Sequence, residues 1–189
     1  MRIFTQIKSF AMVVAMILVA SAASQAISTG FASGRKLLAW QNFDQWQLKA
    51  GPGESSWTSP EVHPGSHWDQ LILSWNLNRL ADCQFHVKVK TYEGSSVWYC
   101  LGRWSAGSTP GKRESDLTSK DKFGRVDTDT LVMNEPAEAF QIRVTVTHRE
   151  PIQSIPLKLL TASLVDTRVR LRDGSTRIDA VREMMIPKR

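Results

Sequence analysis

Two cysteines and four histidines are the residues whose chemistry best suits nucleophilic catalysis in this chain. They are Cys83, Cys100, His63, His67, His86 and His148. A cysteine nucleophile needs a thiolate beside a histidine that accepts its proton. No histidine has a signature spacing to either cysteine, and both cysteines lie in strand-like segments. The pattern therefore favours core thiols over a nucleophile, and we expect no catalytic residue in this chain.

Two pairs of side chains are weak candidates for metal binding. His63 and His67 are four residues apart, but they flank a Pro-Gly turn, so a surface turn explains them better than a metal site. Asp127 and Asp129 alternate with Thr128, and in a strand their carboxylates share one side, where they can clamp Ca²⁺. Salt bridges explain this pair better, because the calcium-loop pattern is absent. We expect no metal and no cofactor.

Tryptophan is unusually abundant in this chain. The seven are Trp40, Trp46, Trp57, Trp68, Trp75, Trp98 and Trp104. A tryptophan suits both a sandwich core and a platform on which a sugar stacks. We expect Trp75, Trp98 and Trp104 in the core. Trp57 and Trp68 border loops and are the better candidates for ligand contact, with packing at the core or its rim as the alternative.

The elements that must position these residues read as β-strands. Short alternating segments, separated by Gly, Pro, Ser and Asn clusters, predict strands near 38–48, 56–63, 69–77, 83–92, 96–104, 126–133, 139–148 and 156–166. About eight strands with frequent turns favour an all-β antiparallel sandwich or jelly roll. We assign this domain to residues 38–166, after a linker at 27–37 and before a charged tail at 167–189. Residues 105–124 form a long polar connection.

One predicted hairpin carries a candidate binding surface. If Tyr92 faces Val97, the inner face holds Phe85, Val87, Val89, Cys100, Gly102 and Trp104. On the outer face, His86 then lies opposite Arg103, Lys88 opposite Leu101, and Lys90 opposite Tyr99. The strip formed by Lys88, Lys90, Tyr99 and Arg103 is a candidate site for a glycan or an acidic chain. A solvated sheet face is the more common explanation.

The same register determines whether a disulfide can join Cys83 and Cys100, a pairing that is common when a protein is secreted. Cys100 lies opposite Val89, six residues along the strand from Cys83. That separation is about 20 Å at about 3.4 Å per residue. A disulfide allows roughly 7 Å between Cα atoms. We therefore predict that both thiols are buried and unpaired.

The first 26 residues predict a secretory signal peptide. Arg2 and Lys8 precede an apolar stretch at 11–23, and small residues mark a cleavage site after Ala26, or alternatively after Ala22. The stretch is shorter than the roughly 20 residues that span a bilayer, although an uncleaved anchor is the alternative. The expected location is secreted or periplasmic, without a membrane segment after cleavage.

Composition and charge exclude other classes. Apolar residues make up 42% and charged residues 22% of the 189 residues, which is typical of a globular protein and not of a disordered one. The formal net charge is +6, and cleavage removes two positive charges to leave about +4. Lysine and arginine are spread along the chain, so a nucleic-acid partner is not expected.

Five segments together resemble a known module. They are WTSP at 57–60, LILSWN at 71–76, WYCLGRWS at 98–105, VDTDTLVM at 126–133 and AFQIRVTV at 139–146. In this order they are similar to the N-terminal β-sandwich of secreted bacterial papain-like cysteine peptidases of the bacteriocin-leader-processing type, family thirty-nine of the cysteine peptidases. The similarity covers about residues 40–166.

The resemblance implies an accessory role. In that family, a linker and a short Val/Ile-Pro-x-Arg segment lead to the peptidase domain, and residues 186–189 (IPKR) are similar to that segment. No residue here matches the catalytic motifs of the family. The expectation is an exported, non-catalytic module from a truncated or split gene, or a stand-alone copy. Its partner would be a separately encoded peptidase domain or a cell-wall or extracellular polymer. A carbohydrate-binding module is the alternative.

Overall fold

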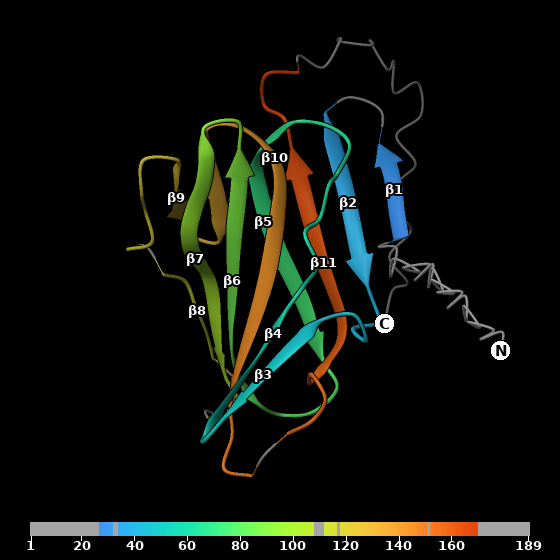
Figure 1. The fold of residues 1–189 in the computed structure, drawn as a ribbon, viewed down its shortest axis with the longest axis vertical. Coiled ribbons are helices and arrows are strands. Elements are labelled where there is room, and N and C mark those ends of the chain that lie inside the picture. The colour runs from blue at the N-terminus through green and yellow to red at the C-terminus, as the bar shows by residue number, and fades with distance from the viewer. Residues whose placement is uncertain (1–26, 32–33, 108–111, 117, 151, 170–189) are drawn as a thin grey trace, which may run out of the picture.

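The computed structural model describes residues 27–31, 34–107, 112–116, 118–150 and 152–169, and these form strands and loops without a helix (Figure 1). The strands are β1 (Ile27–Phe31), β2 (Arg35–Trp40), β3 (Gln47–Gly51), β4 (Glu54–Thr58), β5 (Trp68–Leu77), β6 (Asp82–Thr91), β7 (Gly94–Ser105), β8 (Lys112–Glu114), β9 (Gly124–Asp127), β10 (Thr130–Thr147) and β11 (Leu157–Val165). Every pairing is antiparallel. The all-β sandwich-like class is confirmed; the predicted signal peptide lies outside the described residues.

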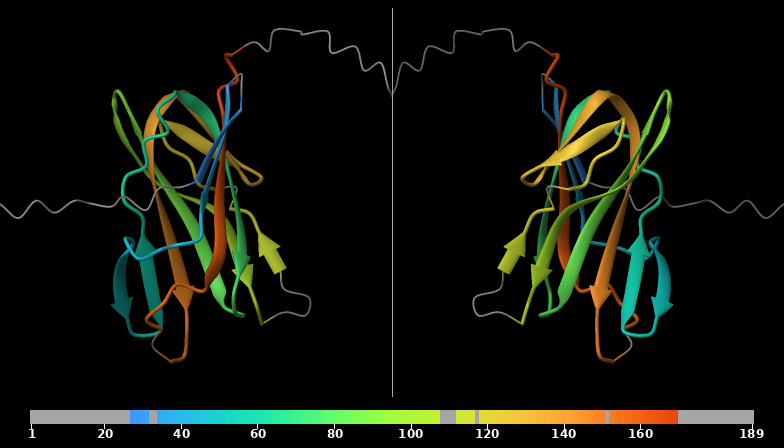
Figure 2. Two further views of the ribbon diagram at one scale, coloured as in Figure 1. Left: turned by 90° about the vertical axis from the view of Figure 1, so that its right-hand side faces the viewer. Right: turned by 90° about the vertical axis from the view of Figure 1, so that its left-hand side faces the viewer.

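One long strand, β10, joins the two layers of the structure. Its first part pairs with β5 and β9, and its second part pairs with β6 and β4. The change occurs at an irregularity between Val132 and Ala137, where Pro136 lacks the N–H that a regular ladder needs. The sheet, with the order β1-β2-β11-β5-β10-β6-β7-β8, therefore curls (Figure 2), and Trp75 of β5 contacts Phe85 of β6.

The core fills the space inside this curl. Alternation along β6 buries Cys83, Phe85, Val87 and Val89 on one side. Phe85 stacks on Trp75 of β5 with ring centroids 3.9 Å apart, which joins the two layers directly. Each large apolar side chain buried in this way contributes about 1.5–3 kcal/mol to stability. The two layers are thus held together by interdigitated side chains, and the opposite face of β6 is left for polar groups.

Several predicted boundaries need correction. The single strand predicted at 38–48 is wrong: β2 ends at Trp40, and β3 begins only at Gln47. The linker predicted at 27–37 contains β1 and the start of β2, which pair with each other. The two strands predicted at 126–133 and 139–148 are largely one strand, β10, because a bulge rather than a loop accommodates Pro136. The described part of the chain contains no helix that could cross a membrane.

The predicted hairpin register is also wrong. The turn is two residues long, since Thr91 pairs with Gly94, and irregularities then shift β7 twice against β6. Gly94 has a φ of 143°, a conformation that glycine adopts more readily than other residues. As a result Tyr99 lies opposite Val87 on the core side, and Trp98 lies opposite Lys88 on the outer side. Trp98 and Tyr99 therefore exchange the inward and outward positions predicted for them, whereas Trp104 lies opposite the buried Cys83.

The β9–β10 hairpin supplies a stability test at Gly124. A Cβ atom at this position would lie 2.6 Å from the carbonyl oxygen of Val132, which is backbone and cannot rotate away. We expect Gly124→Ala to lower the free energy of unfolding by about 1–3 kcal/mol, as overpacking does. Gly107→Ala is the matched control, because nothing lies within 4 Å of its added Cβ. Urea denaturation checks both; equal stability of the two variants would contradict the packing described here.

Candidate functional site

A groove of about 780 Å³ lies between the β3–β4 hairpin and the face of β10, β6 and β7 that points away from the core. We call this the cationic groove. It is lined by Gln47, Leu48, Lys49, Ala50, Gly51, Pro52, Glu54, Ser56, Thr58, Lys88, Trp98, Gln141, Arg143 and Thr145. Its size falls within the roughly 300–1,000 Å³ of common ligand pockets.

Strand alternation places the side chains of the groove floor. On β10, Ile142 and Val144 are buried, so Arg143 points to the opposite face. The register sets Arg143 opposite Thr58 of β4 on one side and His86 of β6 on the other. One row along, Lys88 lies between Gln141 and Trp98. The floor is therefore built on four adjacent paired strands.

Charge and aromatic contact give the groove its chemistry. The guanidinium carbon of Arg143 lies 4.0 Å from the centre of the Trp98 ring, a cation–π contact. The Nε of Arg143 also donates to the hydroxyl of Thr58 at 3.3 Å. Lys49, Lys88 and Arg143 are the cations of the lining, and Glu54 is its one acid. This arrangement can bind an anionic ligand that also has polar groups.

The predicted outer strip is divided by the structure. Lys88 lines the groove, whereas the ammonium of Lys90 pairs with Glu61 at 3.3 Å. Arg103 pairs with Asp116 at 3.2 Å. Tyr99 is fully buried on the core side, because the register differs from the predicted one. Of the four residues of the strip, Lys88 alone lines the cationic groove.

Tyr99 instead belongs to a network around Asp121. The Tyr99 hydroxyl donates to the Asp121 carboxylate, which also accepts from the backbone N–H groups of Val97 (2.9 Å), Phe123 (2.8 Å) and Gly124 (3.2 Å). Burial raises the pKa of Asp121, but these hydrogen bonds outweigh burial and hold its pKa below the ordinary value. Burial, followed by the hydrogen bond to Asp121, raises the pKa of Tyr99. The network ties the 121–124 turn to β7.

The two tryptophans proposed for ligand contact lie in the core. Trp57 is 3% exposed and Trp68 is 1% exposed, so neither offers the open ring face that stacking on a sugar requires. Trp68 packs edge-on against Phe140, with ring centroids 5.6 Å apart. The indole of Trp57 forms part of the wall of a separate cavity of about 490 Å³ beside Trp46. Their place beside loops in the sequence did not lead to exposure.

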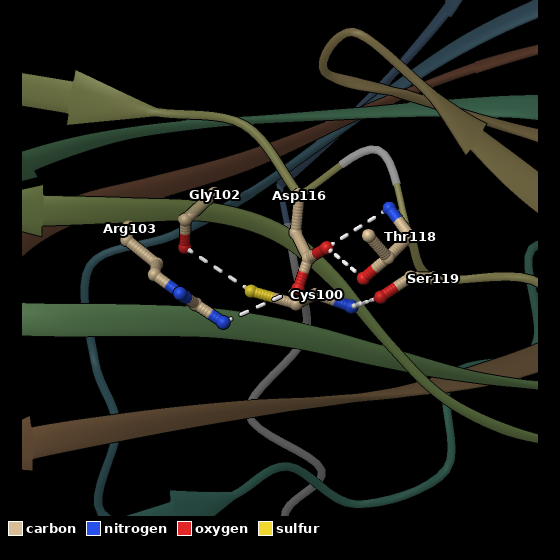
Figure 3. A network of polar contacts seen from close by, with 6 residues as sticks. All are labelled: Cys100, Gly102, Arg103, Asp116, Thr118 and Ser119. Atoms are coloured by element: carbon tan, nitrogen blue, oxygen red, sulfur yellow. Dashed lines mark hydrogen bonds and ion pairs between the residues drawn. The ribbon is translucent and has the colours of Figure 1, made fainter.

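Cys100 is buried on the outer side of the sheet, a correction to its predicted inward position. It lies opposite His86 because of the register shift in β7. Residues 116, 118 and 119 pack over it, and its backbone N–H donates to the hydroxyl of Ser119 at 3.1 Å (Figure 3). The thiol donates to the carbonyl oxygen of Gly102 at 3.9 Å. The described residues 116, 118 and 119 of the polar connection thus cover this thiol.

Protonation also disfavours a nucleophile at either cysteine. Both thiols are buried and free. Burial, followed by the charge of Asp82, raises the pKa of Cys83 to about 12. Burial raises the pKa of Cys100 as well, and burial lowers the pKa of the neighbouring His86. Each shift favours the neutral form, so the thiolate and imidazolium pair that cysteine catalysis uses is not stabilised here.

A serine–histidine contact that sequence reasoning missed lies elsewhere. The hydroxyl of Ser55 and Nε2 of His148 are 2.8 Å apart, joining residues that are far apart in the sequence. Ser55 is 2% exposed, and within the described residues the buried Nδ1 of His148 has no hydrogen-bond partner. The pair therefore lacks the third group of a triad and an approach for a substrate. It fastens β4 to the end of β10.

The aspartates considered for calcium do not share a strand face. β9 ends at Asp127 and β10 begins at Thr130, with Thr128 in the turn at a φ of 60°. Asp129 pairs with Arg113 at 3.3 Å. The regular strand assumed for this pair is therefore a tight turn. Among the residues described, no group of three histidine, cysteine or acidic side chains could hold a metal ion.

Sequence reasoning missed Lys49, Trp98 and Arg143. The Pro52-Gly53 pair is a turn signal that marks a β3–β4 hairpin. Arg143 alternates with apolar neighbours in β10, which marks it as a polar face residue. Trp98 carried no such signal, because its side depends on the irregular register of β7.

A family model for the Peptidase C39 N-terminal domain matches residues 36–163. The chain belongs to this family. The match runs from β2 to β11 and so includes every residue of the cationic groove. It is a match to the N-terminal domain and not to the catalytic domain, so the chain contains a peptidase-associated domain. Searches of curated proteins and of solved structures found no match.

The buried thiols give a reactivity test. In the native C39 N-terminal domain, we expect Cys83 and Cys100 to resist a thiol reagent near pH 7.5, because both are buried and their raised pKa values keep them protonated. In denaturant, both should react. Counting the thiols that react with an aromatic disulfide reagent checks this. Rapid labelling of either cysteine in the folded protein would contradict the sealed position.

The Asp121 network gives a pH test. The pKa of this carboxyl is lower in the folded than in the unfolded chain, so its contribution is present above its unfolded pKa and is lost as the pH falls through the folded pKa. We expect Asp121→Asn to lower the free energy of unfolding by about 1–3 kcal/mol near pH 7. The difference from wild type should shrink below about pH 4.

The control for this pH test is Asp127→Asn, at an exposed position. Its free energy of unfolding should stay within about 0.5 kcal/mol of wild type. Unfolding by urea at several pH values measures both variants. A difference for Asp121→Asn that does not change with pH would contradict a role for the charged carboxylate.

Proposed function

We propose that this C39 N-terminal domain is an exported, non-catalytic accessory module that recognises a ligand through its cationic groove. The observation that carries the proposal is the groove itself, with Lys88, Trp98 and Arg143 on adjacent strands. It is concave and within the size range of ligand sites, and it lies inside the segment that matches the family.

The non-catalytic part of the proposal is supported by the chemistry of the candidate nucleophiles. Cys83 and Cys100 are buried and protonated, and Ser55 is enclosed. A hydrolytic role would need one of these groups in an open cleft beside a base. The groove instead presents cations, hydroxyls and amides, which are groups for binding.

Export is supported by the sequence that precedes the domain. Arg2 and Lys8 followed by the apolar stretch at 11–23 are typical of a signal peptide, which would direct the module out of the cytoplasm. There, a separately encoded peptidase domain or a cell-wall or extracellular polymer would be its partner. In this proposal, a peptidase domain attached to the module would be held near the polymer that the groove binds, which raises its local concentration there.

A carbohydrate-binding module is the second candidate, and a second cavity favours it. This cavity, of about 440 Å³, is lined by Trp75, Asn76, Leu77, Asn78, Arg79, Leu80 and Trp104. Tryptophan rings and amide side chains are groups that bind sugars. Both faces of Trp75 have neighbours, namely Phe85 and the guanidinium of Arg113, so Trp104 is the better candidate for contact with a sugar.

A binding panel separates the two sites. Purified protein is titrated with soluble peptidoglycan fragments, neutral glycans, anionic glycans and peptides, and binding is measured by calorimetry. For a groove ligand, we expect Arg143→Ala to weaken binding by about tenfold or more, since charge-assisted contacts are lost. Trp104→Ala should leave that binding unchanged.

Lys158→Ala is the matched control, because this exposed lysine lies on β11, which contributes no residue to the groove. It should bind within about twofold of wild type. Loss of binding in Trp104→Ala with retention in Arg143→Ala would favour the second cavity. Equal binding by wild type and Arg143→Ala for every ligand that binds would overturn the groove as the site.

A further inference from the structure

We propose that the cationic groove binds an extended acidic peptide segment, which adds as a strand to the open edge of β3. This inference rests on the proposed function and names its ligand class. Strand addition to a sheet edge is a recurring mode of peptide recognition: main-chain hydrogen bonds supply affinity, and side-chain pockets supply specificity.

The first support is the edge itself. β3 pairs with β4 on one side, and within the described part of the chain no strand pairs with its other side. All five of its residues are exposed. An exposed strand edge presents a row of N–H and C=O groups that another chain can pair with. β3 therefore offers a template for one further strand.

The second support is the position of this edge in the groove. Every residue from Gln47 to Gly51 lines the cavity, so main chain as well as alternate side chains borders it. Five residues of strand span about 17 Å. An extended ligand of about five residues would therefore lie along β3 with its side chains over the groove floor.

The third support is charge. The lining contains Lys49, Lys88 and Arg143 against the single acid Glu54. The guanidinium of Arg143 is already held by Trp98 at 4.0 Å and by Thr58 at 3.3 Å, which leaves less side-chain freedom to be lost on binding. A guanidinium held in this way suits a carboxylate, because the two groups form paired hydrogen bonds.

Two other occupants fit less well. A neutral sugar would stack on an aromatic face, but Arg143 covers one face of Trp98, the tryptophan of the groove. A second copy of this chain, pairing β3 with β3 in antiparallel fashion about its centre, would bring Lys49 of each copy together. Like charges directly opposite each other destabilise such a pair. The charge of the groove favours an acidic segment over both.

The experiment uses short peptides of defined charge. A nine-residue peptide of alternating Glu and Thr is titrated into the purified protein at low salt. A Gln/Thr peptide of equal length and an oligogalacturonate are titrated separately under the same conditions. We expect the Glu/Thr peptide to bind about tenfold or more tightly than the Gln/Thr peptide, because its carboxylates meet the three cations. Affinity should fall at high salt.

Variants locate the binding. Lys88→Glu and Lys49→Glu should each weaken binding of the Glu/Thr peptide by about tenfold. Lys158→Glu is the control: it makes the same charge change on β11, away from the groove, and should leave binding within about twofold. Using two groove variants keeps the test valid if one of them folds poorly, since Lys49 is exposed on the edge strand.

N-methylation of the ligand tests strand pairing. Two versions of the Glu/Thr peptide are made, one methylated on the backbone nitrogens of all Glu residues and one on those of all Thr residues. Each version lacks the N–H donors on one side of the strand. Alternate N–H groups of a strand point to the same side, so one methylated peptide should lose binding and the other should retain it. Binding of both methylated peptides with the affinity of the parent would overturn strand addition.

The remaining outcomes separate this inference from the function on which it rests. In one outcome, oligogalacturonate binds and the Glu/Thr peptide does not, and Lys88→Glu abolishes the oligogalacturonate binding. This result would overturn the peptide inference and keep the groove as a ligand site. Concentration-dependent dimerisation lost in Lys49→Glu or Lys88→Glu would identify a second copy as the occupant and overturn the peptide inference. Absence of any ligand whose binding depends on Lys88 or Arg143 would overturn both.

Discussion

The structure depends on one constraint, which is that β10 must belong to both layers. Its 18 residues pair first with β5 and β9 and then with β6 and β4, and the change is made at the irregularity that contains Pro136. Beyond this irregularity, successive side chains of β10 point to opposite faces of the sheet. Ile142 and Val144 enter the core, while Arg143 points away from it. The groove floor and the core are therefore built by the same strand, and a one-residue slip would exchange them.

The groove also needs the sheet to continue past β10. The β3–β4 hairpin attaches to the second part of β10 and forms the other wall. This hairpin is fastened at its far end by the contact between Ser55 and His148. On the opposite side, the Tyr99–Asp121 network holds β7 in the register that turns Trp98 outward. Contacts remote from the groove thus determine which side chains it presents.

The features that could be predicted from the sequence are those that depend on neighbouring residues along the chain. Alternation is local, so it located the strands near 69–77, 83–92, 96–104 and 156–166 within a few residues. Register is not local. The position of Trp98 depends on a two-residue turn and on irregularities in β7, and no short window of residues shows either. The burial of Trp57 and Trp68 also depends on residues distant in the sequence, such as Phe140 beside Trp68.

Building the groove on strands rather than on loops has an energetic consequence. Ordering a flexible loop on binding costs about 0.5–1.5 kcal/mol for each immobilised side chain. Here Arg143 is already fixed by an aromatic ring and a hydroxyl, and Lys88 is half-buried between its neighbours. Asp116, Thr118 and Ser119, from the long polar connection, lie beside Cys100 and do not line the groove (Figure 3). Because the groove side chains are already held before binding, the entropic cost of ordering falls mainly on the ligand and less on the protein.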